Sequence, residues 1–546
     1  MVLSTSTRKV GLCWALAASI ALQCFILYYQ LNYGWLVGLI PWDDCAIVLR
    51  SLENLDKLAQ SHSLWHMLGA ALHLDIHAPV SDIQTLAGLL LAGGAIWGPY
   101  ALNVTYLCIA ICAISTTVAL KEPLAFGTSV LFLLVQPITF RALAGLLSDW
   151  QGGILLAAAM VLLFDAAEEN NNYGRTLGAA LLGLTLITKM TAFYLPVLVL
   201  GVFAAFEFYG AVRRKVAAKN GSKSSPTGWE RQRTMCVGLI LLPYLLFFFY
   251  SHKPLLAYIH NALGPLWRDG FTIPERLLFY SPFGGHLRPD VPPPPWGELH
   301  FIFLIFLVAA FIATVFKRDW LHMLVCTGVV LIAAMFLTPL VLAPTSAVSF
   351  GGPFLGAIMG GTLISLRIFV LNTPSWGALV APVIVLALAL PGPLPLGPPL
   401  DQNGMFVGRD ELKQYQSIND DMAGMIAQRE TSARPEVVFT FDHNLMPYPD
   451  LSIRHFQRTG RFLSIDRIDD FADHDAASLL TDADFVITIT PVGGARTVPN
   501  LSRGIPTSAD PALGDARVRE IGRYGLIVSY QIRSGEIRLY QAGAPR

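Results

Sequence analysis

The apolar residues of this chain arrive in long blocks separated by short polar loops, and this pattern limits its fold more than any other feature. Of the 546 residues, 54% are hydrophobic and only 14% are charged, and the mean hydropathy is +0.52. A helix of roughly twenty apolar residues spans the hydrocarbon core of a bilayer. The sequence therefore predicts a polytopic α-helical membrane protein.

We expect about eleven transmembrane helices. The first covers about residues 10–29, and we interpret it as an uncleaved helix because the run is long, no small-residue cleavage site is obvious and more spans follow. A polar and amphipathic stretch fills roughly 33–97. The other expected spans are 99–120, 123–141, 150–165, 176–188, 191–210, 235–251, 299–316, 320–342, 351–371 and 376–392.

Basic residues give the predicted orientation. Arg8 and Lys9 precede the first span, and two later loops carry Arg213, Arg214, Lys215, Lys219, Lys223, Arg231 and Arg233, and Lys317 and Arg318. Even numbers of expected spans separate these loops from the N-terminus, so all of these residues fall on one side, as the positive-inside rule requires of the cytoplasmic side. The odd total of crossings puts the C-terminus on the opposite side. We expect a multi-pass protein of the bacterial inner (plasma) membrane, with its N-terminus cytoplasmic and its C-terminal region periplasmic or extracellular.

The composition changes after a proline-rich segment at 391–399, which cannot continue a helix. We predict a transmembrane domain over 1–396 and a soluble α/β domain with a partly parallel sheet over 397–546. Its expected strands are 437–441, 462–465, 485–489, 526–530 and 537–540. Its expected helices are 409–428, 447–459, 468–481 and 515–523.

Several function classes lack support in the sequence. The formal net charge is zero, so no overall field favours nucleic acid or another highly charged partner. The seven cysteines fall mostly in or beside apolar blocks, which indicates no disulfide framework. Walker and dinucleotide-binding glycine loops are absent from the sequence.

An acid pair, Asp43 and Asp44, directly follows the first span. Adjacent carboxylates beside a membrane are costly to desolvate and repel each other. Either they are exposed loop residues that end a helix, or they are held there to manage a proton or a cation. Leu49, Leu52 and Leu55 then recur at helical spacing, which predicts a short amphipathic helix on the membrane surface.

Two further groups on the same face have alternative explanations. His73 and His77 flank Asp75 at a spacing that suits a divalent cation, or they are solvated loop residues before Pro79. Asp149 is an N-cap for a helix that starts near Gln151, a member of the active site, or both.

Cations also lie near the expected membrane surface. Lys189 marks a tight turn between two apolar helices, where it neutralises an anionic group or snorkels. Arg268 and Arg276 alternate with aromatic residues in a loop over 252–300. This pattern suits a lipid phosphate, although an interfacial aromatic belt explains the aromatic residues equally well.

The order of these motifs resembles the GT-C superfamily of polyprenyl-phosphate-dependent glycosyltransferases, in particular the protein mannosyltransferase and aminoarabinose lipid A transferase branch. The resemblance covers roughly the first 210 residues. Its motifs are Asp43-Asp44, His77-Ala78-Pro79, Arg141 with Ser148-Asp149, and Gly183-Leu184-Thr185-Leu186-Ile187-Thr188-Lys189.

The resemblance implies a catalytic group of Asp43, Asp44 and Asp149, with Asp43 as the first choice of general base. The implied substrate-binding residues are His77, Arg141, Lys189, Arg268 and Arg276. A divalent ion such as Mg²⁺, Mn²⁺ or Ca²⁺ would be held by Asp43, Asp44, His73 and His77.

The sequence therefore favours an inverting hexosyl- or pentosyltransferase. It would move sugar from a polyprenyl-phosphate donor to a glycan or lipid-linked acceptor of the cell envelope, on the extracytoplasmic face. The alternatives are a transporter or flippase for a lipid-linked substrate, and a non-catalytic membrane anchor of a surface-glycan assembly complex. Transporters often carry repeats and mid-membrane charges, which this sequence does not show.

Overall fold

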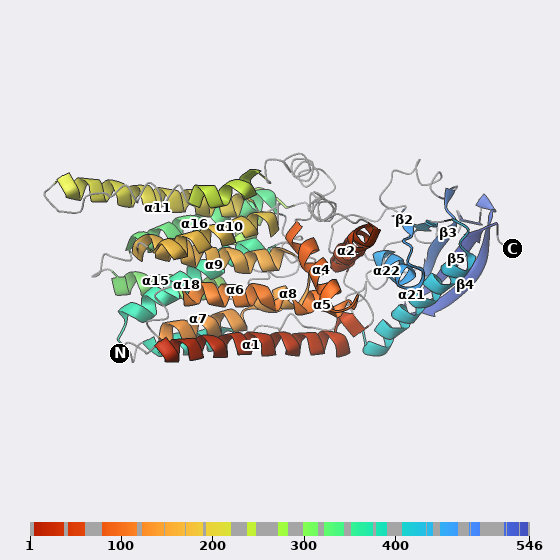
Figure 1. Ribbon diagram of the computed structural model, residues 1–546, viewed down its shortest axis with the longest axis horizontal. Helices are drawn as coiled ribbons and strands as arrows, with labels where there is room; N and C mark the ends of the chain where they lie inside the picture. The colour runs from red at the N-terminus through yellow and green to blue at the C-terminus, as the bar shows by residue number, and fades with distance from the viewer. Residues whose placement is uncertain are drawn as a thin grey trace. The chain divides into compact units, whose positions relative to one another are not determined.

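Most of the chain is described by a computed structural model (Figure 1). The described residues are 5–37, 42–60, 79–116, 123–146, 148–169, 171–188, 193–219, 237–246, 271–281, 299–314, 321–342, 351–374, 378–389, 407–432, 434–440, 448–467, 480, 482–491, 518–519, 521–533 and 535–543.

The chain folds into two compact units, and each unit draws on separate stretches of sequence. The first consists of Met1–Ile26, Leu72–Gln84 and Pro99–Pro395. The second consists of Leu27–Ala71, Thr85–Gly98 and Leu396–Arg546. Part of the segment that follows the first expected span therefore belongs to the same unit as the C-terminal residues.

Helices make up the described chain as far as residue 389 (Figure 1). They are α1 (Thr5–Asn32), η1 (Trp35–Val37), α2 (Trp42–Gln60), α4 (Pro79–Leu91), α5 (Trp97–Ala101), α6 (Val104–Ser115), α7 (Pro123–Val135), α8 (Pro137–Ala144), α9 (Ser148–Glu169), α10 (Asn172–Thr188), α11 (Tyr194–Lys219), α14 (Ile273–Tyr280), α15 (Leu299–Thr314), α16 (Leu321–Val341), α18 (Gly352–Asn372) and α20 (Val380–Ala389).

Several of these helices suit a bilayer. Within the described residues, five are long and apolar enough to cross a membrane, namely Lys9–Asn32, Trp97–Ser115, Ser148–Ala167, Leu321–Leu340 and Gly352–Asn372. A sixth crossing is added if the bent pair α7 and α8 forms one span. The mostly helical, apolar character predicted from the sequence is therefore confirmed, whereas the number of eleven crossings stays a prediction.

Helices α9 and α18 pack side by side in the interior of the first unit (Figure 1). Both helices are mostly apolar and are buried on nearly all sides. Glycines allow their backbones to approach closely, because a Cβ added at Gly356 would overlap the carbonyl oxygen of Gly153. A Cβ added at Gly352 would overlap the backbone of Asp149. This contact fixes the beginning of α9, where Asp149 lies.

The span expected over 123–141 is not one continuous helix, because the structure divides it into α7 and α8 with a bend of 58°. The break falls at Gln136, whose backbone is extended at φ −77° and ψ 138°. Pro137 explains the break: its ring disfavours helical geometry at the preceding residue and suits the first position of a new helix.

One basic loop also differs from the expectation. Helix α11 extends from Tyr194 to Lys219, so Arg213, Arg214 and Lys215 belong to a helix rather than to a loop. The reason is that these residues have good helix propensity and no proline or glycine separates them from the apolar run.

The C-terminal part of the second unit contains a sheet and two helices. The elements are α21 (Arg409–Arg429), β1 (Glu436–Phe439), α22 (Tyr448–Thr459), β2 (Ser464–Arg467), β3 (Phe485–Pro491), β4 (Tyr524–Ile532) and β5 (Gly535–Ala542). The five strands lie in the order β2-β1-β3-β5-β4. Strand β1 pairs in parallel with β2 and β3, and β5 pairs antiparallel with β3 and β4.

Alternation along the strands gives this sheet two buried faces. Val437 and Phe439 of β1 join one hydrophobic core together with residues of α21 and α22. Val438, which points the other way, joins a second core that includes Leu480 and Val518. All five strands lie where alternation predicted them, within a few residues, and so do α21 and α22. The helices expected over 468–481 and 515–523 lie largely outside the described residues.

Candidate active site

The acid pair lies in the first turn of α2, not in a loop. Asp44 is only 2% exposed, and at i, i+4, i+8 spacing it shares one helix face with the buried Val48 and Leu52. The alternative of an exposed loop aspartate is therefore wrong for Asp44. A carboxylate in the first turn is stabilised by the positive end of the helix dipole, which offsets part of the cost of burial. Asp43 is in the same turn, but its side chain lies outside the described residues.

The amphipathic helix predicted after the acid pair is confirmed, but its buried face differs from the expected leucine stripe. Ile47, Val48 and Leu52 are buried, whereas Leu49 and Leu55 are half-buried. Helix α22 of the same unit packs against α2. Protein therefore covers part of the surface that the sequence assigned to the membrane.

Arg141 and Asp149 lie at the facing ends of consecutive helices. Arg141 is in the last turn of α8, and its guanidinium carbon is 4.8 Å from the centroid of the Trp150 ring. Asp149 is fully buried in the first turn of α9. Its predicted role as an N-cap is wrong, because the helix begins at Ser148 and Asp149 already lies within it. The arrangement places a cation and a carboxylate on one short connection.

Hydrogen bonds from side-chain amides stabilise the connection between α8 and α9. The last carbonyls of α8 have no partners within their own helix, which is costly away from water. Gln151 Nε2 donates to the carbonyl oxygens of Ala142 at 2.9 Å and Gly145 at 2.8 Å. Asn103 Nδ2 donates to those of Leu143 at 3.1 Å and Gly145 at 2.8 Å. The side-chain amides of Gln151 and Asn103 thus supply hydrogen-bond donors to the carbonyls at the end of α8, beside Arg141.

More polar side chains extend this amide network. Gln23 of α1 donates to the carbonyls of Tyr100 at 3.0 Å and Leu143 at 3.3 Å. Tyr106 donates its hydroxyl to Gln84 at 2.5 Å. The sequence analysis missed these residues, although a polar side chain inside an apolar block was the signal that could have found them.

Arg276 lies in α14, which begins with a capping box of Thr272 and Glu275. Its Nη1 lies 3.5 Å from the carbonyl oxygen of Pro339 in α16. Because α16 ends at Val341, the carbonyl of Pro339 is one of the last four of the helix, which have no donor within it. The contact therefore gives Arg276 a structural role at the place where a phosphate-binding role was predicted.

Two ion pairs, one buried and one partly buried, join helices of the first unit. Arg367 of α18 pairs with Asp165 of α9, and both side chains are 3% exposed. Arg175 of α10 pairs with Glu207 of α11 at 2.6 Å. Removal of one partner from such a pair is strongly destabilising, because the other charge then stays buried without a partner. The two pairs fasten α9 to α18 and α10 to α11.

The positions of four other predicted site residues are not described by the structure. His73, His77, Lys189 and Arg268 lie outside the described residues, although α10 ends at Thr188, directly before the expected turn. Within the described part of the chain, no three metal-ligating side chains come together. The metal site assigned to Asp43, Asp44, His73 and His77 therefore stays a prediction. Arg141, Asp149 and Arg276 belong to the first unit and Asp44 to the second.

These observations define a polytopic helical membrane protein that carries a mixed-sheet α/β unit and buried acids at the starts of its helices. No family model matches the chain, and no curated protein matches it. Among solved structures, the chain is similar to ArnT from Cupriavidus metallidurans in the apo state, with a TM-score of 0.54 and 13% identity over 98% of both chains. A structure of the same ArnT bound to undecaprenyl phosphate aligns over 98% of both chains at 13% identity, with a TM-score of 0.49. The chain thus has the fold of this ArnT.

Proposed function

We propose that this chain is an integral membrane glycosyltransferase that moves a sugar from a polyprenyl-phosphate donor to a glycan or lipid acceptor of the bacterial cell envelope. The observation that carries the proposal is Asp44, which is buried in the first turn of α2, the first α-helix after the apolar α1. The likeness of the fold to ArnT is a second support for a membrane transferase that uses a polyprenyl-phosphate-linked donor.

The chemistry needs a base and a stabilised leaving group. The acceptor oxygen bonds to the anomeric carbon as the bond from that carbon to the phosphate oxygen breaks, with inversion at carbon. The acceptor proton passes to a carboxylate within hydrogen-bond reach. We assign the base to the Asp43–Asp44 pair, with Asp43 as first choice, because a neighbouring carboxylate at Asp44 raises the basicity of its partner.

The departing polyprenyl phosphate carries negative charge that positive groups stabilise. Arg141 suits this role because its planar guanidinium, backed by the Trp150 ring, presents several donors in a fixed direction. Lys189, which follows directly on the end of α10, is the second cation in the proposal. Asp149 would hold a sugar hydroxyl, and a divalent ion on the acid pair would add to the positive charge.

Single substitutions at the acid pair test the proposal. Asp43→Asn and Asp44→Asn keep the size of the side chain but remove its basicity, so we expect one of them to lower sugar transfer by about 10²–10⁴-fold. The measurement is transfer from radiolabelled polyprenyl-phosphate sugars by membranes with equal amounts of inserted protein. Asp56→Asn, on the same helix, is the matched control and should transfer at the parent rate. Parent-level transfer by both acid-pair variants would contradict the assignment.

A transporter or flippase for a lipid-linked substrate is the second candidate, and the broken helix at Gln136 favours it. Transporters place binding sites at helices interrupted within the membrane, and α7 and α8 meet at a bend of 58°. Reconstituted vesicles without acceptor would distinguish the two functions. Movement of a labelled lipid-linked sugar between leaflets supports the transporter, whereas transfer only upon addition of acceptor supports the glycosyltransferase.

A further inference from the structure

We propose that the C-terminal α/β part of the second unit positions the acid pair, by holding α2 against α22. This inference rests on the proposed function, since it assigns a role to the acid pair in transfer. It gives the C-terminal residues a task in catalysis that acts through the acid pair.

The segment after the first apolar helix is attached to the C-terminal sheet at several points. Val37 of η1 packs against the hydrophobic core that β1, β3, β5 and α21 form. Helix α2 then packs against α22 (Figure 1). Glu53 of α2 also pairs with Arg434, just before β1, at 3.9 Å between Oε1 and Nη2. The acid pair lies between Val37 and Glu53 in sequence, so it is held on both sides.

Helix α22 is itself firmly fixed on α21. Asp450 accepts hydrogen bonds from Asn419 Nδ2 at 2.9 Å and from Arg454 Nε at 2.5 Å. Arg454 also donates to Asp420 at 2.9 Å. Burial alone would lower the pKa of Arg454, but the Asp450 and Asp420 carboxylates raise it above its ordinary value. The cation is therefore present throughout the working pH range, and so is the network.

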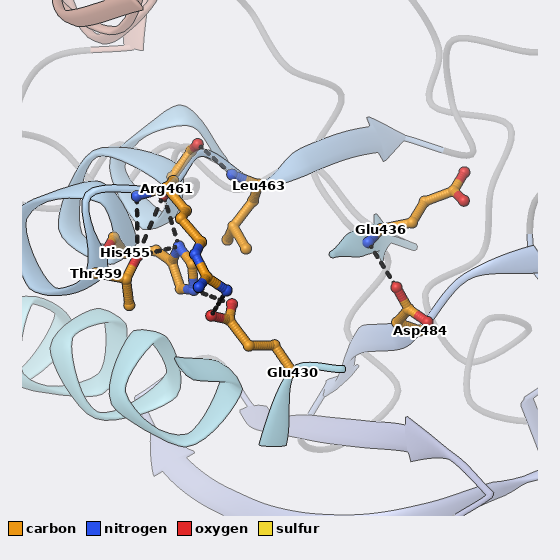
Figure 2. Close-up of polar contacts among 8 residues, drawn as sticks. Glu430, Glu436, His455, Thr459, Arg461, Leu463 and Asp484 are labelled. Carbon is orange, nitrogen blue, oxygen red and sulfur yellow. Dashed lines mark hydrogen bonds and ion pairs between the residues drawn. The ribbon is translucent and has the colours of Figure 1, made fainter. Parts of the chain in front are cut away.

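A second cluster fixes the other end of α22. Figure 2 shows His455, which is fully buried, with Nε2 2.8 Å from Glu430 Oε2 and Nδ1 2.8 Å from the carbonyl oxygen of Arg461. Glu430, in turn, accepts a hydrogen bond from Arg461 at 3.2 Å. Because α22 is anchored at both ends, its surface is a rigid support for a helix that packs on it.

The geometry of α2 carries this support to the acid pair. Asp44, Val48 and Leu52 share one buried stripe, so a shift of the packed helix moves Asp44 with it. Displacement of a catalytic group by a fraction of an ångström lowers the rate of the chemical step. The same displacement leaves the affinity for the donor unchanged if the residues that bind the donor phosphate belong to another part of the protein. Arg141, which we propose for that role, belongs to the first unit.

Charge reversal across the Glu53–Arg434 contact tests the proposal in the full-length protein. Glu53→Arg and Arg434→Glu each place like charges together, whereas the double swap restores an attractive pair. The matched controls are the same charge reversals and the same double swap at Glu411 and Arg533, an ion pair of 3.7 Å in the C-terminal part of the second unit. Asn419→Ala, which removes one hydrogen bond to α22, is an independent way to loosen the support.

Two readouts are measured on each variant: hydrogen exchange of the amides in 42–60, and kcat and KM for the polyprenyl-phosphate sugar. For the single reversals we expect faster exchange in α2 and a kcat lowered about twofold to fivefold, since an exposed ion pair is a weak contact. KM should stay unchanged, and the double swap should recover both readouts. The Glu411 and Arg533 variants should behave as the parent.

Unchanged exchange in α2 for the reversals and for Asn419→Ala would overturn the proposal. So would faster exchange with a parent-level kcat, because α2 would then be held for a purpose other than catalysis. If the parent protein transfers no sugar from any donor, the proposed function fails and the positioning role in transfer fails with it. The exchange data would then still show separately whether α22 holds α2.

Discussion

At the scale of single residues, two of the buried acids, Asp44 and Asp149, share a position in their helices. Asp44 is in the first turn of α2 and Asp149 in the first turn of α9. A helix N-terminus carries partial positive charge and free amide groups, so it is the least costly place to bury a carboxylate. The sequence indicated both residues through their charge beside apolar blocks, but it misjudged the helix starts by a few residues.

The Arg141–Trp150 contact leads to a prediction about the use of the donor. Trp150→Leu removes the ring beneath the guanidinium, whose attraction is about 0.5–2 kcal/mol. We expect kcat/KM for the polyprenyl-phosphate sugar to fall about threefold to tenfold, through a higher KM for the charged donor and a lower kcat for departure of its phosphate, as steady-state kinetics would show. Trp150→Phe keeps an aromatic face, so its kcat/KM should lie between those of the parent and Trp150→Leu. A parent-level kcat/KM in Trp150→Leu would remove Arg141 from donor binding.

Glu436 gives a prediction for pH. Partial burial raises the pKa of this carboxyl, and the nearby Asp466, Asp482 and Asp484 raise it further. Figure 2 shows Glu436 beside Asp484, whose Oδ2 accepts its backbone N–H at 3.0 Å. A raised pKa in the folded state means that protonated Glu436 favours folding. This contribution is present at acid pH and is lost as the pH rises through the folded-state pKa.

Glu436→Gln should therefore stabilise the C-terminal sheet at pH 7, where the parent carries the repulsive charge. The gain should vanish below about pH 4, where the parent carboxyl is protonated. Hydrogen exchange of β1 and β3 amides at the two pH values measures the difference. A variant less stable than the parent at pH 7 would show that the charge of Glu436 is favourable instead.

At the scale of elements, apolar blocks and alternation were enough to find most helices and strands, but not where helices break. Gln136-Pro137 interrupts an apolar run that hydropathy alone reads as one span. The dipeptide was a visible signal, because proline restricts the residue before it. The hydrogen bonds of Gln151 and Asn103 could not be predicted from the sequence, because their partners are backbone carbonyls that only the fold brings close.

The contact of α9 and α18 yields a prediction at this scale. In Gly356→Ala the new methyl group meets the backbone of Gly153, which cannot rotate away as a side chain would. We expect a loss of about 1–3 kcal/mol in stability. The midpoint of thermal unfolding in detergent should fall accordingly. Gly328→Ala is the control, because a Cβ at that position in α16 meets nothing within 4 Å. Equal midpoints for both variants would mean that α9 and α18 are free to separate.

At the scale of the whole molecule, sequence patterns identified the helices and the sheet but not which segments assemble together. Leu27–Ala71 joins a unit with residues from 396 onward, and no local pattern reports a partner so distant in sequence. Periodicity shows that a helix has a buried face but does not show what covers it. For α2 the prediction of a membrane surface was the simplest one, and only the fold revealed α22 on it.

This assembly predicts how instability spreads through the chain. Leu539 lies in the interior strand β5, within the core on which Val37 packs. Leu539→Ala should lower the stability of the second unit by about 2–5 kcal/mol. Hydrogen exchange should therefore accelerate in the sheet and also in η1 and α2, which belong to the same unit. Exchange in α9 and α18 should stay near the parent rates, because units with separate cores open separately.

Leu363→Ala, a buried leucine of α18 in the first unit, is the matched control and should reverse this pattern. It should accelerate exchange in α9 and α18 and leave 42–60 unchanged. If Leu539→Ala accelerates exchange in the sheet but not in α2, the helix has its own stability, and the acid pair does not depend on the C-terminal core. If both variants accelerate exchange everywhere, the two units unfold as one cooperative body.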